Sequence, residues 1–155
     1  MKTKLLVVGK TNDKNITKGI DDYVGRVKHY MPFDIEVIPE LKNTKSLTQS
    51  NQKEMEAEQI LKRLQPSDTV VLLDEHGKEY RSIEFARWIE KQQTARSLVF
   101  IIGGPYGFAD SVYERSDAKL SLSKMTFSHQ MIRLLFVEQI YRACTIIKGE
   151  PYHHE

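Results

Sequence analysis

Hydroxyl and apolar side chains alternate along one segment, LSLSKMTFSHQMIR (residues 120–133). The residues that carry them are Ser121, Leu122, Ser123, Met125, Thr126, Phe127 and Ser128. Such a mixture suits a ligand with an apolar face and hydrogen-bonding edges, of which adenosine is an example. A loop without a ligand is the alternative, and in both cases Ser128 is expected to cap the helix that follows.

A pair of adjacent glycines follows the apolar run SLVFII, in the segment GGPYGF (residues 103–108). Glycine lets a ligand approach main-chain N–H and C=O groups closely, and Pro105 stiffens the turn. A tight turn between a strand and a helix would explain the glycines equally well. The dinucleotide motif GxGxxG is absent, and residues 9–11 (GKT) do not complete a P-loop, because Lys4 stands where its first glycine would be.

Charged residues interrupt the most apolar part of the chain, residues 128–147. His129 and Arg133 stand four residues apart, as do Glu138 and Arg142, so each pair shares one face of a helix. Between the two pairs the predicted helix is apolar nearly all round, and such a helix is buried on every side. We therefore expect it to lie in a subunit interface, with the core helix of a monomer as the alternative.

Two adjacent histidines occur in the segment GEPYHHE (residues 149–155), directly after this helix. Three interpretations compete for the segment: the remnant of a purification tag, a solvated tail, and part of a site. A tag would give a run of histidines, whereas this segment also carries a proline, a tyrosine and two glutamates.

Apolar runs alternate with helical patterns, which is typical of an α/β fold with a mostly parallel sheet flanked by helices. The predicted strands are residues 5–9, 33–39, 69–74, 97–102 and 118–123, and the predicted helices are residues 13–30, 48–64, 81–93, 110–116 and 128–147. Two of the strands are apolar throughout and should be central. Ligands of such sheets bind beyond the carboxyl ends of the strands, so residues 72–77, 101–108 and 120–127 are expected to meet there.

The composition is that of an ordinary globular domain, with 155 residues, 40% hydrophobic and 28% charged. The formal net charge is only +2, so the overall basic field that announces many nucleic-acid-binding proteins is absent. A single cysteine, Cys144, allows no intrachain disulfide and fits a reducing compartment. With no pattern of a signal peptide or membrane span, we expect a cytoplasmic protein without a membrane partner. The ligand spacing of zinc sites and the GxSxG motif of hydrolases are also missing.

Four segments in this order resemble one known family: VVLLDEHGK, FIIGGPYGF, LSLSKMTFSHQMIRLLFVEQIYRA and PYHHE. It is the family of ribosomal RNA large-subunit methyltransferase H, in the SPOUT class of methyltransferases, and the resemblance covers the full length. It implies a single SPOUT methyltransferase domain over residues 1–155. It further implies that the C-terminal segment is threaded into a deep trefoil knot, which general rules of topology would not predict.

The resemblance also implies S-adenosylmethionine (S-adenosyl-L-methionine) as cofactor, held in a bent shape, and no metal. The residues that match the family's cofactor contacts are Leu73, Gly103, Gly104, Leu122, Ser123, Lys124, Met125, Thr126 and Phe127. The expected contacts are main-chain hydrogen bonds to adenine and apolar packing against its face.

The reaction that the resemblance implies is methyl transfer to N3 of a pseudouridine in helix 69 of the 23S ribosomal RNA. The implied substrate is the assembled ribosome and the implied active form is a homodimer, with no role for DNA. Two alternatives remain: a SPOUT methyltransferase of another RNA such as tRNA, and a non-catalytic ribosome-associated binding module with the same fold.

Residues toward the RNA are expected in the last helix and the segment after it. The candidate catalytic residues are His129, Arg133, Arg142, Tyr152, His153 and His154. A histidine is the natural base for the N3 proton near neutral pH, and the arginines are expected to hold phosphates or a uracil carbonyl. The tyrosine is expected to stack on a flipped base, and Glu138 to orient Arg142. The segment PYHHE would then lie near the methyl donor, in the pocket of a second copy.

Overall fold

The computed structural model describes residues 1–155. Strands and helices alternate along it as predicted, with most ends shifted by only a few residues. The strands are β1 (Lys2–Val8), β2 (Phe33–Ile38), β3 (Asp68–Glu79), β4 (Ser97–Ile102) and β5 (Ala118–Ser121). The helices are α1 (Lys14–Val27), α2 (Gln49–Leu61), α3 (Ser82–Lys91), α4 (Asp110–Arg115) and α5 (Met131–Lys148), with short 3₁₀ turns η1 (Thr44–Ser46) and η2 (Gln92–Thr94).

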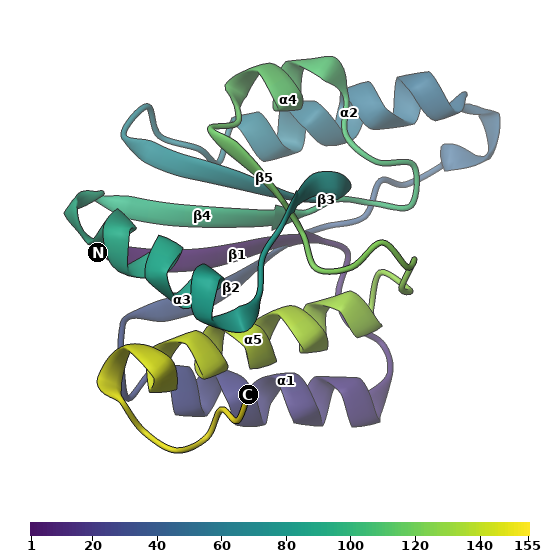
Figure 1. Ribbon diagram of the computed structural model, residues 1–155. Helices are drawn as coiled ribbons and strands as arrows, with labels where there is room; N and C mark the ends of the chain where they lie inside the picture. Colours follow the sequence, from purple (N-terminus) through teal and green to yellow (C-terminus); the bar gives the residue numbers. More distant parts are fainter.

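All five strands are parallel and lie in the order β2-β1-β4-β3-β5 (Figure 1). This arrangement confirms the predicted α/β fold with a mostly parallel sheet flanked by helices. β4 and β3 are internal strands, as their apolar runs predicted. Residues 98–102 of β4 are all buried, because helices cover both faces of the sheet.

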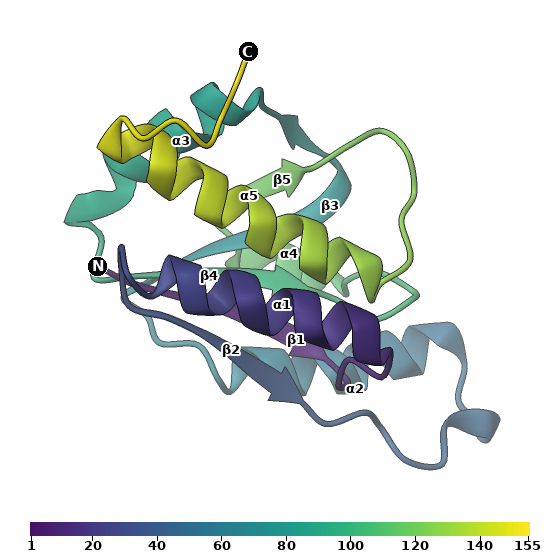
Figure 2. The same cartoon turned by 90° about the horizontal axis from the view of Figure 1, so that it is seen from below.

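Three helices lie on one face of the sheet, α1, α3 and α5, and two on the other, α2 and α4 (Figures 1 and 2). Alternate residues of β4 serve the two layers. Phe100 packs against Phe136 of α5, with ring centroids 4.7 Å apart, whereas Ile101 belongs to the core that contains Ile60 of α2. α5 lies between α1 and α3 and is the most buried of the helices, as its composition predicted.

β3 does not end at Asp74 as predicted but continues to Glu79 with an outward turn. Leu120 of β5 pairs with both Leu73 and Lys78, so residues 74–77 are left out of the pairing. Gly77 allows this close return, because a Cβ at that position would lie 2.7 Å from the main-chain nitrogen of Leu120. The turn carries its side chains past the edge of the sheet, where they meet the loops that follow β4 and β5.

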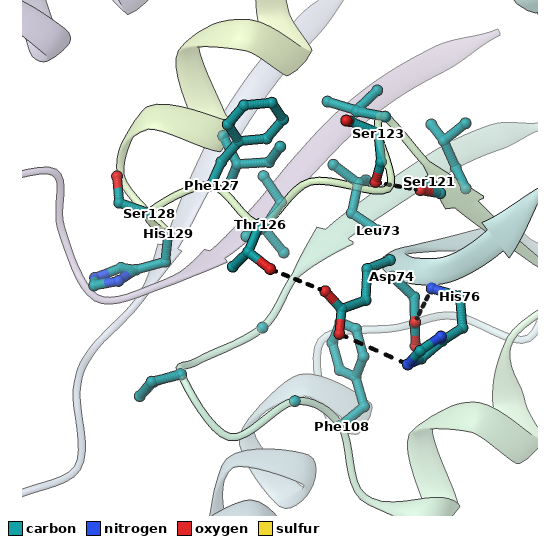
Figure 3. Close-up of a pocket in the computed structure, with 18 of the residues that line it drawn as sticks. Leu73, Asp74, His76, Phe108, Ser121, Ser123, Thr126, Phe127, Ser128 and His129 are labelled. Atoms are coloured by element: carbon teal, nitrogen blue, oxygen red, sulfur yellow. Dashed lines mark hydrogen bonds and ion pairs between the residues drawn. The ribbon is translucent and has the colours of Figure 1, made fainter. Parts of the chain in front are cut away.

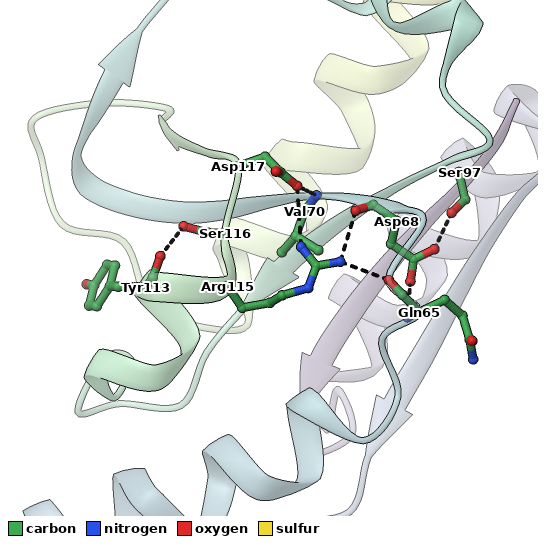
Figure 4. Close-up of polar contacts among 8 residues, drawn as sticks. All are labelled: Gln65, Asp68, Val70, Ser97, Tyr113, Arg115, Ser116 and Asp117. Atoms are coloured by element: carbon green, nitrogen blue, oxygen red, sulfur yellow. Dashed lines mark hydrogen bonds and ion pairs between the residues drawn. The ribbon is translucent and has the colours of Figure 1, made fainter.

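A polar cluster at the amino edge of the sheet holds the connection between α4 and β5 (Figure 4). Arg115 Nη2 donates to the carbonyl oxygens of Gln65 at 2.8 Å and Asp68 at 3.0 Å. The Asp117 carboxylate accepts from the N–H of Val70 at 2.8 Å. These bonds bring β5 against β3, and they therefore also place the loop that leaves β5 at the opposite edge.

Both ends of α5 have identifiable caps. Ser128 Oγ accepts from the N–H of Met131 at 3.1 Å, so this serine caps the turn that leads into α5, although the N-cap residue itself is Gln130. Gly149 ends the helix in the left-handed conformation, at φ 72°. None of the helices combines the length and apolarity that crossing a bilayer requires.

Candidate functional site

A cavity of about 540 Å³ opens at the carboxyl edge of the sheet (Figure 3). It is lined by the outward turn of β3, the glycine segment after β4, the loop after β5 and the first residues of α5. The prediction that these strand ends would meet is therefore confirmed. The volume lies within the range of small-molecule and cofactor sites.

Eight of the nine residues that the resemblance assigned to the cofactor line this cavity. They are Leu73, Gly103, Gly104, Leu122, Ser123, Met125, Thr126 and Phe127. The ninth, Lys124, turns its side chain away: the side chain is 86% exposed and its Nζ lies 3.8 Å from a carboxylate oxygen of Glu79.

The loop after β5 uses its own hydroxyl groups to hold its shape. Ser121 Oγ donates to the carbonyl of Ser123 at 2.9 Å, and Ser123 Oγ accepts from the N–H of Met125 at 3.0 Å. Thr126 Oγ1 donates to Glu75 Oε2 at 3.3 Å. Hydroxyls that the sequence suggested for a ligand therefore order the loop instead. What the loop offers the cavity is main chain and apolar surface.

An acidic turn that was not among the predicted site residues also lines the cavity, at Asp74, Glu75 and His76. Burial would raise the pKa of Asp74, but hydrogen bonds from the Tyr113 hydroxyl and the His76 N–H outweigh it and hold the pKa below its usual range. Asp74 is therefore ionised at neutral pH. The His76 side chain is 84% exposed and lines the cavity at its solvent side. The strand end LLDEHG was the signal that could have identified all three.

Two glycines let main chain form part of the cavity wall. A Cβ on Gly103 would lie 2.9 Å from the ring of Phe108, and a Cβ on Gly104 would lie 2.7 Å from Oε1 of Glu56. Neither glycine has a positive φ, so the close approach of Phe108 and Glu56, rather than backbone conformation, disfavours a side chain at these positions. The lack of side chains lets Phe108 and Glu56 pack directly against the main chain of this turn, which lines the cavity.

His129 and Arg133, the predicted pair at the start of α5, lie in two different environments. His129 lines the cavity. Arg133 is 1% exposed, and its Nη1 donates to the Gly9 carbonyl at 2.8 Å and to Thr11 Oγ1 at 3.0 Å. Its Nη2 donates to the Val8 carbonyl at 2.8 Å. Arg133 therefore joins α5 to the end of β1 and is not free for the phosphate or carbonyl contact that the sequence suggested.

The remaining predicted residues form a second group, the tail cluster, which comprises Glu138, Arg142, Tyr152 and His153. Arg142 Nη2 donates to Glu138 Oε1 at 2.5 Å, and the Tyr152 hydroxyl donates to the same oxygen at 3.0 Å. The Arg142 guanidinium also lies over the Tyr152 ring, 4.8 Å from its centroid. Glu138 thus orients Arg142 as expected, and the segment after α5 is folded against its own chain.

Arg142 also determines where His153 carries its proton. Arg142 Nη1 lies 3.1 Å from His153 Nδ1, and a guanidinium can only donate. Nδ1 is therefore the acceptor, so the proton of the neutral ring is on Nε2. That nitrogen is buried without a hydrogen-bond partner, 3.7 Å from Oε1 of Glu155. His154, the next residue, is exposed.

The loop after β5, which lines the cavity, and the segment after α5 lie at opposite ends of α5 (Figure 2). Ile132 lines the cavity, and Arg142 stands ten residues further along the helix, roughly 15 Å along its axis. Within one chain the cofactor residues are therefore separate from the tail cluster, and of the residues assigned to the RNA only His129 lies at the cavity.

The chemistry of the cavity fits an adenosine-containing cofactor. Phe108 and Phe127 provide apolar walls, and the turn at Gly103 and Gly104 offers bare main chain for hydrogen bonds. The ionised Asp74 supplies a negative charge beside them, which suits a cationic ligand. No group of histidine, cysteine and acidic side chains is arranged to hold a metal ion.

Known proteins share this sequence over its whole length. A family model described as "Predicted SPOUT methyltransferase" matches residues 1–153. A protein of Bacteroides fragilis named Ribosomal RNA large subunit methyltransferase H is 65% identical over 157 aligned positions, which cover 100% of both chains. Proteins of the same name from Phocaeicola vulgatus and Bacteroides thetaiotaomicron are 64% and 61% identical, again over 100% of both chains. The chain therefore belongs to the SPOUT methyltransferase family.

Proposed function

We propose that this methyltransferase acts on ribosomal RNA, at N3 of a pseudouridine in helix 69 of the large subunit. S-adenosylmethionine is the proposed methyl donor, and the assembled ribosome in the cytoplasm is the proposed substrate. One observation carries the proposal: a glycine-walled cavity at the carboxyl edge, in a chain 65% identical to a protein named Ribosomal RNA large subunit methyltransferase H.

The cofactor would be held mainly by main chain. S-adenosylmethionine supplies a methyl group on a cationic sulfur, which activates that group for transfer. Gly103, Gly104 and the loop 122–127 provide N–H and C=O groups for the adenine edge, and Phe127 provides an apolar surface for its face. Lys124 takes part through its main chain alone, because its side chain faces solvent.

We further propose that residues 1–155 form one domain whose last segment is threaded as a deep trefoil knot. β5 is an edge strand, yet α5, which follows it, packs between α1 and α3 across the sheet. A return of this kind supports the threading that the family resemblance implies. An experimentally determined chain trace in which residues 122–130 pass through no loop would contradict the knot.

A homodimer would bring together the two groups that one chain keeps apart. α5 leaves a partly exposed stripe between its neighbours, formed by Met131, Leu135, Glu138 and Arg142. A second copy packed antiparallel on this stripe would place its tail cluster beside the cavity. Sedimentation should therefore give the mass of a dimer, and Leu135→Glu should give monomers that no longer transfer methyl groups.

His129 is the proposed base. It lines the cavity, so it is placed to accept the N3 proton of a pseudouridine to which bound S-adenosylmethionine would supply the methyl group. Arg133 would act at a distance, by fixing the start of α5 against β1. In the tail cluster, Arg142 would hold a phosphate or a uracil carbonyl, and the Tyr152 ring would stack on the flipped base.

His153 would serve as a hydrogen-bond donor instead of a base, because Nδ1 accepts from Arg142 and Nε2 holds the proton. The ¹⁵N shifts of the ring should accordingly be those of the Nε2–H tautomer. His153→Gln keeps a donor near the position of Nε2 and should retain most activity, whereas His153→Asn keeps only the acceptor toward Arg142. Equal loss in both variants, with a changed acidic limb of the pH–rate profile, would contradict this role and leave His153 as a base.

The decisive experiment is a methylation assay with intact ribosomes, ribosomes lacking pseudouridine in helix 69, isolated ribosomal RNA and tRNA. We expect N3-methylpseudouridine, identified by mass spectrometry, only from intact pseudouridylated ribosomes. Methylated tRNA would instead support a SPOUT enzyme of another RNA. Ribosome binding without methylation of any RNA would support the non-catalytic module.

A further inference from the structure

Glu56 of α2 is the one buried acidic residue of the chain, with 7% of its surface exposed. No cationic group balances it: its surroundings are the Gln52 amide, the main chain of Gly104 and the carboxylate of Glu40. The Gln52 amide nitrogen is 3.4 Å away, a long hydrogen bond. Glu56 is therefore a buried carboxylate without a counter-ion, and it lies against the main chain of another segment.

That segment is the turn that walls the donor cavity. A Cβ on Gly104 would lie 2.7 Å from Oε1 and 2.9 Å from Oε2 of Glu56, so the carboxylate lies directly against this residue. The proximity of the Gly104 main-chain N–H opposes the rise in the pKa of Glu56. Gly104 thus has Glu56 behind it and the cavity in front.

Stability does not account for Glu56. A buried carboxylate without a counter-ion is costly, and an apolar residue there would extend the core formed by Ala57 and Ile60. Burial raises the pKa of Glu56, and the charge of Glu40 raises it further, so the fold makes ionisation of this carboxyl less favourable than in water. A destabilising group of this kind is typical of functional sites.

We infer that Glu56 is a positioning residue for the donor cavity, and that its carboxylate holds the turn at Gly103 and Gly104 where its main chain can meet the cofactor. The inference rests on the proposed function for the identity of the ligand. It does not depend on which RNA is methylated.

The contact between Glu56 and Gly104 can be tested by adding a methyl group at one residue and removing side-chain volume at the other. Gly104→Ala should weaken binding of S-adenosylmethionine by at least about 10-fold in calorimetry, because the new methyl group displaces the turn. Glu56→Ala should weaken it by about 10-fold, because the turn loses its support. The double variant should bind within about threefold of Glu56→Ala, because the alanine at 104 then has room. Glu56→Gln keeps the shape and an acceptor, so it should bind within about threefold of the unchanged protein.

Two matched controls separate this contact from general effects of the substitutions. Gly25→Ala adds a methyl group on α1 where nothing lies within 4 Å, and Glu58→Ala removes an exposed carboxylate from α2. Both should leave donor binding unchanged. If the losses of donor affinity in Gly104→Ala and Glu56→Ala multiplied in the double variant, the inference would be overturned. Unchanged donor binding in Glu56→Ala would overturn it as well.

Two further measurements do not require a bound ligand. Hydrogen exchange at residues 103–108 should speed up in Glu56→Ala and stay unchanged in Glu58→Ala; no change in either would overturn the inference even if the protein bound no S-adenosylmethionine. That failure of binding would count against the proposed function alone.

Because the pKa of Glu56 is raised on folding, its charge lowers stability above the usual glutamate pKa near about 4.3. Glu56→Gln should therefore melt no lower than the unchanged protein at pH 7, and any gain should vanish toward pH 4.

Discussion

At the amino edge of the sheet, the residues of the polar cluster around Arg115 form hydrogen bonds with one another. Asp68 Oδ2 accepts from the N–H of Gln65 at 2.7 Å, its other oxygen accepts from the Ser97 hydroxyl, and its carbonyl accepts from Arg115. At the carboxyl edge, the same sheet has a buried acid without a counter-ion, bare glycine main chain and a loop whose Met125 is 74% exposed. An edge closed by its own bonds supports the fold, whereas an edge that leaves groups open supports a ligand.

Blocking the open edge should have the largest effect. Gly103→Trp places an indole where a Cβ alone would lie 2.9 Å from the Phe108 ring, so donor binding should fall more than about 100-fold. Calorimetry with S-adenosylmethionine measures this, and circular dichroism should show a folded protein. Gly25→Trp, on an open face of α1, is the control. Unchanged donor binding in Gly103→Trp would mean that the cavity is not the donor site.

Disrupting the polar cluster at the amino edge should lower the stability of the protein and leave donor binding unchanged. Arg115→Met removes the donors to the carbonyls of Gln65 and Asp68, so unfolding should become easier by about 2 kcal/mol. Urea denaturation measures the loss. Arg87→Met, which removes an exposed pair with Glu90, should change stability by less than about 0.5 kcal/mol. A weaker donor affinity of folded Arg115→Met would contradict the separation of the two edges.

The tail cluster differs from both edges, because it is ordered within the chain and yet proposed to act in a second copy. Tyr152→Phe removes the hydroxyl that donates to Glu138 and keeps the ring beneath Arg142. Methylation of ribosomes should slow by about 10-fold with unchanged donor affinity. Tyr30→Phe removes a hydroxyl that donates to Glu150 and should have little effect. Parallel losses of donor affinity and rate in Tyr152→Phe would place the tyrosine in the donor site.

The smallest effect is expected at Asp74, because this residue of the carboxyl edge already accepts hydrogen bonds from Tyr113 and from the His76 N–H. The folded protein holds the pKa of Asp74 below its unfolded value, so the carboxylate stabilises the fold above about pH 4 and loses that contribution as the pH falls through the lowered pKa. Asp74→Asn should be less stable by under about 1 kcal/mol at pH 7. Denaturation at pH 7 and pH 3 should show the difference shrinking in acid; a constant difference would contradict the ionic contribution.

Pattern alone identified the strand ends that form the cavity, because buried parallel strands read as continuous apolar runs. It could not show that β3 runs on past Asp74, since the turn at residues 74–77 depends on Gly77 packing against β5. It also placed Arg133 beside His129 on one face, whereas packing of α5 against β1 buries the arginine and leaves the histidine at the cavity. Spacing determines a helical face, but not which neighbour covers it.

What the amino-acid sequence determined by itself is the alternation of elements, the parallel sheet and the three segments at its carboxyl edge, because these depend on local periodicity and on residues such as glycine. The partners of individual polar groups were decided by the tertiary structure alone. In the sequence, Glu56 is one of several charged residues in the segment 48–64, and only packing brings it against Gly104, 48 residues away. The same holds for His153, whose tautomer depends on Arg142. Hydrogen bonds act over about 3 Å, and distances of that order between remote residues are fixed only when the chain has folded.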